Sequence, residues 1–176
     1  MIICEGMDNS GKTTLVKYLA ENLPNAKLVP THGPVKPEEV NTILRSIGMA
    51  VCYRKPLIYD RFPIISEMVY GEILRNGSAF NAVYDCDLLL GWLKACNPLI
   101  IYCRPFKETI FQSIKDRPQM AGVVKSKEAL LSRYDDVMAN LSAREFLRYN
   151  YDSTVGSSGV WSAVKYYLET VKEITL

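Results

Sequence analysis

The residues from Gly6 to Thr13 have the types and the spacing needed to bind a phosphate chain. They fit the pattern of a glycine, four residues of any type, then Gly-Lys-Ser/Thr. Glycines let the backbone bend so that several amide N–H groups converge on phosphate oxygens. In such a loop the lysine reaches the β- and γ-phosphates and the hydroxyl ligates Mg²⁺. The sequence therefore predicts a loop for ATP and Mg²⁺, with contacts expected from Gly6, Asn9, Ser10, Gly11, Lys12, Thr13 and Thr14.

Further charged residues with candidate roles are Asp8, inside this loop, and Asp60-Arg61, which follow the apolar run Leu57–Tyr59. A carboxylate among phosphates is unfavourable unless a cation or a hydroxyl donor compensates it, so Asp8 implies such a partner. The carboxyl ends of parallel strands are where ligands of open α/β sheets gather, which favours a functional Asp60-Arg61. A structural ion pair of Asp8 with Arg61, or an incidental strand-end pair, would fit the same residues.

The elements that must position these residues alternate between short apolar runs and amphipathic segments. We expect strands at 2–4, 27–29, 57–59, 99–103 and 149–151. Helices are expected at 12–23, from Pro37 to Val51, at 64–75 and 81–96, after Pro105, after Ser126 with Phe146 on its apolar face, and over 160–171. This order predicts an α/β fold of three layers, the fold of P-loop NTPases, with a five-stranded parallel sheet flanked by helices. Residues 1–176 are expected to form a single domain.

Composition excludes several classes of protein. There are 21 Lys and Arg against 19 Asp and Glu, so no global basic field favours nucleic acid or an anionic membrane. Five cysteines without ligand spacing and one histidine give little from which to build a zinc site. The start of the chain lacks the features of a signal peptide, and no apolar run is long enough to span a bilayer. We therefore expect a cytoplasmic protein with no membrane partner.

The run Glu5–Thr14 resembles the phosphate loop of thymidylate kinases, and Asp60-Arg61-Phe62 resembles the Asp-Arg-aromatic motif of that family. Ser66 and Tyr70-Gly71 follow at nearly the family's spacing, and the run Asp60–Glu67 is similar to the compact, phage-encoded branch, which would place the protein in a host cytoplasm. The resemblance implies that Asp8 helps to hold the sugar 3′-hydroxyl of the acceptor. It also implies that Arg61 binds the acceptor phosphate and that Asp60 holds Mg²⁺, through water.

Positions 7–10 contain no arginine, although some thymidylate kinases place a catalytic arginine inside this loop. A phosphate acceptor needs cations between two mutually repelling anions. The catalytic arginine is therefore expected elsewhere. The resemblance implies a short, flexible lid at about 116–127, within the single domain. Arg117 in this lid is the first candidate and Arg104 the second, although either would also fit a solvated surface charge.

The acceptor pocket is the least defined part of the sequence. Thymidylate kinases stack the base on an aromatic residue of the helix before the Asp-Arg motif, with an arginine nearby; here that helix offers Arg45. Phe62 and Tyr70 are further candidates, although aromatic residues at helical spacing also fit a core. His32, which follows a short strand, could touch the acceptor or be an ordinary loop histidine.

The expected activity is Mg²⁺-dependent transfer of the ATP γ-phosphate to a deoxynucleoside 5′-monophosphate, a small-molecule acceptor. One alternative is a kinase for a hydroxyl of a nucleoside or of a modified base in DNA, with Asp8 or Asp60 as the base. A further alternative is a non-catalytic nucleotide-binding module. The chain lacks the Asn-Lys-x-Asp guanine reader of GTPases, which disfavours a nucleotide switch. The resemblance also allows a homodimer formed through the helices that flank the sheet.

Overall fold

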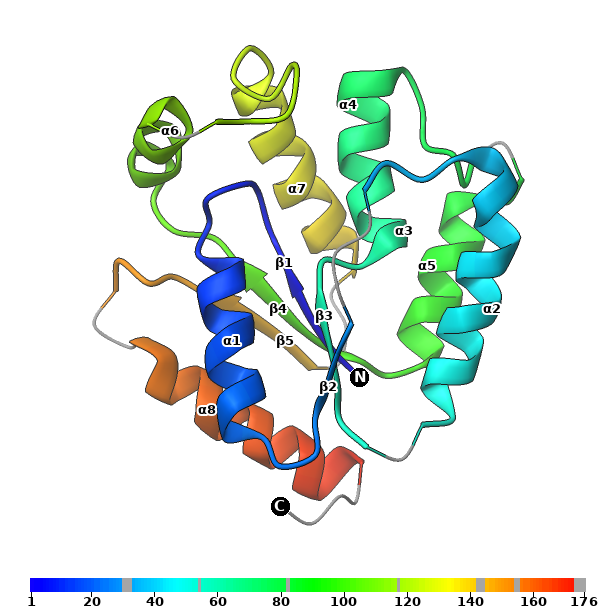
Figure 1. Cartoon of the computed structure of the whole chain (residues 1–176), viewed down its shortest axis with the longest axis vertical. Helices are drawn as coiled ribbons and strands as arrows, with labels where there is room; N and C mark the ends of the chain where they lie inside the picture. The colour runs from blue at the N-terminus through cyan, green and yellow to red at the C-terminus, as the bar shows by residue number, and fades with distance from the viewer. Residues whose placement is uncertain are drawn as a thin grey trace.

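Parallel strands form the central sheet, as the alternating pattern predicts. The computed structural model describes residues 1–29, 33–53, 55–81, 83–116, 118–141, 145–153 and 156–172. The five strands are β1 (Ile2–Glu5), β2 (Lys27–Val29), β3 (Leu57–Asp60), β4 (Leu99–Cys103) and β5 (Glu145–Tyr149). Their order across the sheet is β2-β3-β1-β4-β5, with every neighbouring pair parallel. The strand that precedes the phosphate loop therefore lies in the centre (Figure 1).

Helices cover both faces of the sheet. On one face lie α1 (Lys12–Asn22) and α8 (Gly156–Tyr166), the latter continued by the π-helical turn η3 (Tyr167–Val171) (Figure 1). The elements packed on the other side are α2 (Val40–Val51), α3 (Pro63–Ser66), η2 (Glu67–Gly71), α4 (Glu72–Arg75), α5 (Cys86–Ala95), α6 (Lys107–Asp116) and α7 (Lys127–Leu141). The short 3-10 turn η1 (Pro37–Glu39) precedes α2 and is exposed. None of the helices within the described ranges combines the length and the apolar character that crossing a bilayer requires.

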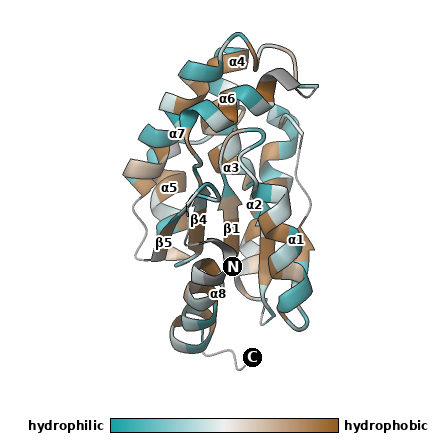
Figure 2. Cartoon of the chain, turned by 90° about the vertical axis from the view of Figure 1, so that its left-hand side faces the viewer, coloured by the Kyte–Doolittle hydropathy of each residue, from teal (hydrophilic) through white to brown (hydrophobic). Residues whose placement is uncertain are grey.

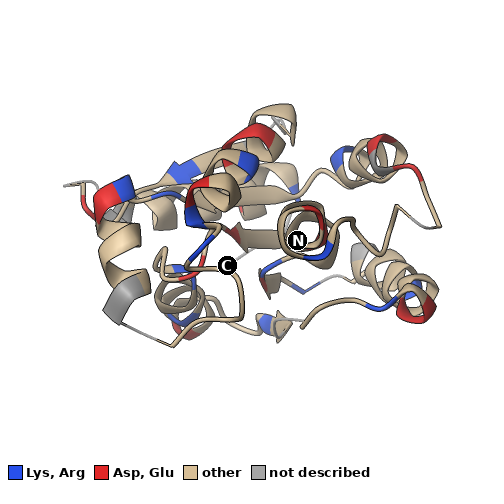
Figure 3. Cartoon of the chain, turned by 90° about the horizontal axis from the view of Figure 1, so that it is seen from above, with Lys and Arg blue, Asp and Glu red and all other residues tan. Residues whose placement is uncertain are grey.

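Alternation along each strand divides the core between the two faces. Ile2 and Cys4 pack with α1 and α8, whereas Ile3 between them packs with the cluster that includes α2, α5 and α7. All three residues are fully buried, since a parallel sheet is covered on both sides. Figure 2 shows the result: the central strands are brown, and the surrounding helices carry both brown and teal residues. Figure 3 shows basic and acidic residues on the same helices, consistent with the nearly balanced charge.

The sheet brings the two chemical motifs together. β1 pairs with β3 so that Cys4 lies opposite Asp60, and the amide of Arg61 donates to the carbonyl of Cys4 over 3.0 Å. The phosphate loop follows β1 and the Asp-Arg motif follows β3, so both leave the same edge of the sheet. Their proximity is thus a consequence of strand order.

Several element boundaries differ from the sequence-based expectation. The helix from Pro37 begins as a 3-10 turn, and α5 begins only at Cys86 because the Asp85 carboxylate caps it by accepting from the amide of Asp87. The expected position of the fifth strand, 149–151, is wrong, since β5 spans Glu145–Tyr149. Phe146 belongs to this strand, where it packs beside Tyr102 of β4, and not to the apolar face of α7.

The segment expected as a lid connects α6 to α7. α6 runs to Asp116 and α7 begins at Lys127, and the described residues between them, 118–126, form no helix. Val123 in this segment is fully buried, while Met120 is exposed. Val123 therefore anchors the segment to the core, whereas Met120 lines the smaller of the two cavities described below.

Candidate active site

The phosphate loop adopts a backbone that its glycines make possible. Gly6 has φ +143° and Gly11 has φ +83°, and Asn9 between them has φ +61°. A Cβ added to Gly6 would lie 2.4 Å from the carbonyl oxygen of Cys103, and one added to Gly11 would lie 2.7 Å from the ring of Tyr151. Both close approaches, together with the left-handed φ, require glycine at these positions.

Replacing Gly6 by alanine is expected to lower the free energy of unfolding by about 3 kcal/mol, because the side chain adds both backbone strain and an overlap with the main chain of β4. Urea denaturation of the two proteins measures the difference. Gly48→Ala is the matched control: its Cβ would have no neighbour within 4 Å, and alanine in helix α2 should stabilise by about 0.5–1 kcal/mol. Equal effects of the two substitutions would contradict this description of the loop.

Lys12 lies at the base of the loop with its ammonium group turned inward. Its side chain is buried, and Nζ donates to the carbonyl of Met7 over 2.6 Å and to Ser10 Oγ over 3.4 Å. Burial, reinforced by the positive charge of Arg61, lowers the pKa of Lys12 to about 8. A buried cation held by neutral oxygens would gain from a phosphate group placed beside it.

A cavity of about 550 Å³ adjoins this loop. It is lined by Asp8, Asn9, Gly11, Lys12, Thr13, Thr14, Asp60, Arg61, Ser113, Tyr149 and Tyr151. Within it Thr13 Oγ1 donates to Asp60 Oδ2 over 3.2 Å, so the hydroxyl and the carboxylate lie next to each other in the cavity. Oxygen donors of this kind suit Mg²⁺. The described residues contain no cluster of three or more His, Cys, Asp or Glu able to hold a metal ion.

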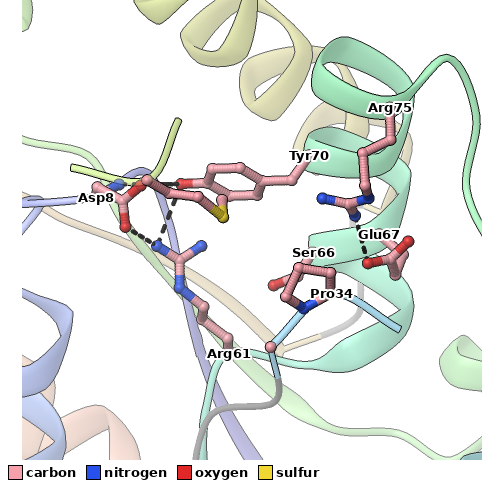
Figure 4. Close-up of a pocket in the computed structure, with 9 residues that line it drawn as sticks. Asp8, Pro34, Arg61, Ser66, Glu67, Tyr70 and Arg75 are labelled. Atoms are coloured by element: carbon pink, nitrogen blue, oxygen red, sulfur yellow. Dashed lines mark hydrogen bonds and ion pairs between the residues drawn. The ribbon is translucent and has the colours of Figure 1, made fainter. Parts of the chain in front are cut away.

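Asp8, Arg61 and Tyr70 form a hydrogen-bonded cluster beside the loop (Figure 4). Arg61 Nη2 lies 2.6 Å from Asp8 Oδ1 and donates to the Tyr70 hydroxyl over 3.2 Å. The Tyr70 hydroxyl donates to Asp8 Oδ2 over 3.0 Å, and burial raises the pKa of Tyr70 to about 12, which keeps that proton in place. Asp8 therefore has both of the partners that its sequence context implied, a cation and a hydroxyl donor.

A buried carboxylate, Glu5, ties the two motifs together. It accepts hydrogen bonds from the amides of Gly6 and Phe62, over 3.2 and 2.5 Å, and from the Ser66 hydroxyl over 3.1 Å. The Tyr134 hydroxyl on α7 donates to Glu5 over 3.2 Å and accepts from Arg61 over 3.0 Å. Burial raises the pKa of Glu5, against the opposing effects of Arg61 and the Phe62 amide. Sequence reasoning did not assign a role to either Glu5 or Tyr134.

A second cavity, of about 240 Å³, also adjoins the Asp8–Arg61 pair (Figure 4). Its lining comprises Asp8, Gly33, Pro34, Arg61, Ser66, Glu67, Tyr70, Arg75 and Met120. Asp8 and Arg61 are the residues that line both cavities. The pair therefore lies at the boundary between the cavity beside the phosphate loop and a second, more apolar cavity.

The remaining sequence candidates are distributed unevenly. Phe62 is fully buried against Tyr59, beneath the site. The described residues that line the two cavities do not include Arg45, exposed on α2, or Arg104, whose guanidinium is paired with Asp135 over 3.0 Å. His32 and Arg117 lie outside the described residues.

Comparison with known proteins shows which solved structures have a similar fold. No family model and no curated protein matches the chain. Among solved structures, YorR from Bacillus subtilis, in complex with phosphorylated GDP, matches with a TM-score of 0.74 and 16% identity over 99% of each chain. Thymidylate kinase from Candida albicans matches with a TM-score of 0.57 and 12% identity, over 93% of this chain and 89% of that one. Deoxyadenosine kinase from M. mycoides matches with a TM-score of 0.53 and 16% identity, over 98% and 99%.

The chain has the fold of P-loop kinases. At these identities the likeness establishes the architecture, and it extends to kinases named for different acceptors. The expected three-layer fold with a five-stranded parallel sheet is thereby confirmed. The choice of acceptor must be argued from the site.

Proposed function

We propose that this protein transfers the γ-phosphate of ATP to a deoxynucleoside 5′-monophosphate, in the manner of thymidylate kinases. The observation that carries the proposal is the pair of cavities that meet at Asp8 and Arg61. A transfer between two bound phosphates requires two adjoining sites with a cation at their boundary. Proteins of similar fold support the substrate class, since they include a thymidylate kinase and a protein in complex with phosphorylated GDP.

The donor nucleotide would occupy the larger cavity. Amides of the loop and the N-terminus of α1 would hold its phosphates, and Lys12 would exchange the Met7 carbonyl for phosphate oxygens. Thr13 and Asp60 would hold Mg²⁺, which would supply neutralisation of the phosphate charge when bound. Lys12, Thr13 and Asp60 all line the cavity, so the assignment needs no rearrangement of the sheet.

The acceptor would occupy the smaller cavity. The planar guanidinium of Arg61 suits two phosphate oxygens at once, and Asp8 would hold the sugar hydroxyl. Transfer then needs a further cation on the migrating group, and we propose Arg117, which follows α6, with Arg104 as the second candidate. Arg104 could take this role only after leaving Asp135.

The test is a screen of ATP consumption with the purified protein and the common deoxynucleoside monophosphates, deoxynucleosides and short DNA duplexes. We expect Mg²⁺-dependent turnover with at least one monophosphate, and activity lost on chelation. Turnover with a deoxynucleoside and none with its monophosphate would overturn the proposal. Absence of turnover with any acceptor would favour a non-catalytic nucleotide-binding module.

A second candidate, a kinase for a hydroxyl acceptor, is favoured by one observation. The Asp8 carboxylate faces both cavities with 29% of its side chain exposed, so it could accept a proton from a hydroxyl placed between them. The similar fold of a deoxyadenosine kinase is compatible with this chemistry. If the hydroxyl belonged to a base in DNA, binding would weaken steeply with salt, which the duplex arm of the screen would reveal.

ATP binding is expected to weaken above about pH 8. The protonated form of Lys12 binds phosphate, and its pKa in the free protein is lowered to about 8, so above this pH binding must take up a proton. Affinity should be flat below the pKa and fall by up to about tenfold per pH unit above it. Titration calorimetry of ADP binding in buffers of different ionisation enthalpy measures both effects. An affinity independent of pH up to about pH 9.5, without proton uptake, would contradict the assignment.

A further inference from the structure

Two ion pairs line the smaller cavity, one on each side. Asp8 and Arg61 face the phosphate loop, whereas Glu67 and Arg75 lie on the opposite side, with Tyr70 and Pro34 between the two pairs (Figure 4). The Asp8–Arg61 pair has a proposed role toward the phosphate and the sugar. The far pair, together with the apolar walls, then faces whatever the acceptor carries beyond its sugar.

Glu67 is a fixed carboxylate. Its side chain is 4% exposed, and it accepts from the amide of Val35 over 3.0 Å, from the amide of Ala79 over 3.3 Å and from Arg75 over 2.5 Å. These donors come from three separate segments, so the carboxylate is held from several directions. Most of its accepting capacity is used by the protein itself. Its role is therefore to orient Arg75.

The backbone around Glu67 is packed closely enough to hold that geometry. A Cβ on Gly71 would lie 3.0 Å from Glu67 Oε2 and 2.9 Å from the carbonyl oxygen of Gly77. The absence of a side chain at Gly71 lets the loop after α4 approach, which brings the Ala79 amide to the carboxylate. The position of Arg75 thus follows from rigid main-chain contacts.

Arg75 presents unused donors to the cavity. In the described part of the chain its guanidinium has no acceptor besides Glu67, and 31% of the side chain is exposed. Figure 4 shows another guanidinium nitrogen directed away from Glu67, toward the space beside Tyr70. A guanidinium carries several N–H donors in one plane and no acceptor. It therefore selects a base edge with two adjacent acceptors.

Resting on the proposed function, we infer that Arg75, oriented by Glu67, reads the acceptor base and selects one with a carbonyl oxygen beside an unprotonated ring nitrogen. Guanine presents this pair as O6 and N7, and cytosine as O2 and N3. Adenine has no carbonyl group, and the thymine carbonyls flank a protonated nitrogen. The geometry thus selects guanine or cytosine over adenine and thymine.

Equilibrium binding tests this assignment without requiring activity. Titration calorimetry compares dGMP, dCMP, dAMP and dTMP, and the corresponding deoxynucleosides, on the wild-type protein. We expect dGMP or dCMP to bind at least about tenfold more tightly than dAMP and dTMP, the discrimination that one good bidentate contact gives. The separate results with guanine and cytosine show which base the cavity takes. Tightest binding of dAMP or dTMP, or no base preference, would overturn the inference.

Two variants of Arg75 make the test specific. R75Q removes the charge, and R75K keeps the charge but loses the planar fork; both should reduce the base preference by about tenfold. R133Q is the matched control: Arg133 on α7 pairs over 2.6 Å with Glu72 on α4, the helix that carries Arg75, and it does not line the cavity. If R75K, folded by its thermal melting curve, retained the wild-type preference, the inference would be wrong.

Failure of the inference and failure of the proposed function are distinguishable. Base preference is measured in both the monophosphate and the nucleoside series, so it can be read whichever of them accepts phosphate. A protein that phosphorylates nucleosides alone, yet prefers guanine or cytosine through Arg75, would refute the proposed acceptor and support the base reader. A protein that phosphorylates dTMP or dAMP best would support the proposed acceptor and refute the base reader.

Discussion

Lys12→Ala is expected to lower kcat/KM for ATP-dependent phosphate transfer by about 10³-fold, equivalent to about 4 kcal/mol of transition-state stabilisation. The ammonium group lies inside the loop, 2.6 Å from the Met7 carbonyl, and lines the larger cavity. A cation placed there neutralises charge that shifts during transfer. No other Lys or Arg of the described loop region could replace it, because residues 6–11 contain neither.

Lys17→Ala is the control for this substitution. Lys17 lies on the same helix, α1, but is exposed, so its removal should leave turnover within about twofold. The Lys12 variant should melt at a temperature no lower than the wild type, since burial of its charge is unfavourable in the absence of phosphate. Near-normal turnover of a folded Lys12→Ala protein would show that the loop does not act as a kinase loop.

Arg61→Ala is expected to raise the KM for the acceptor by about 100-fold while changing the KM for ATP far less. Its guanidinium lies at the boundary of the two cavities and is oriented by Asp8, Tyr70 and Tyr134. Loss of a bidentate contact to a phosphate removes charge-assisted hydrogen bonds that the alanine cannot replace. Initial-rate measurements with each substrate varied in turn separate the two constants.

The Arg61 variant has a second expected effect, on stability. Without the guanidinium, the Asp8 carboxylate and the Tyr134 hydroxyl lose a partner, so the free energy of unfolding should fall by about 1–3 kcal/mol. Arg61→Lys keeps the charge and should show an intermediate acceptor KM. Arg133→Ala removes an arginine that does not line the cavity and should leave both KM values unchanged. An Arg61→Ala protein that lost ATP affinity and kept its acceptor affinity would reverse the assignment of the two cavities.

The features predicted well from the sequence are those encoded in local patterns. The spacing of Gly6, Gly11 and Lys12 specifies a loop that has to lie between a strand and a helix, and it does. The apolar runs gave four of the five strands at their observed places. Three of them, β1, β3 and β4, are buried, and a buried parallel strand is a continuous apolar segment. The fourth, β2, is a short and largely exposed edge strand. The proximity of Asp8 to Arg61 could also be anticipated, since a carboxylate in a phosphate loop demands a partner.

The features that were missed depend on contacts between distant segments. Tyr134 reads as a core position of a helix, and only the packing of α7 against the site shows that its hydroxyl joins Arg61 to Glu5. The position of β5 in the sequence depends on its pairing with β4, and the aromatic residues near Tyr149 do not reveal that pairing. A Glu67–Arg75 pair is separated by a π-helical turn, so ordinary helical spacing would not have placed the two together.

Residue type alone also gave candidates that the fold separates from the cavities. Arg45 occurs on the expected helix, but that helix turns this side chain to the exterior. Arg104 follows β4 as expected, yet Asp135 on α7 holds its guanidinium. The charge of an arginine in the sequence therefore does not show whether the fold turns it toward a cavity, toward a carboxylate or toward solvent.

The measurement that tests the central claim most directly is identification of the phosphorylated product. Phosphorus NMR of the protein with ATP, Mg²⁺ and each deoxynucleoside monophosphate should show a new β-phosphate resonance of a deoxynucleoside diphosphate, formed in step with ADP. The Lys12→Ala protein should form neither product at a comparable rate. If ATP were hydrolysed to free phosphate, or phosphate appeared only on a nucleoside hydroxyl, the two cavities would not be a donor and a monophosphate site.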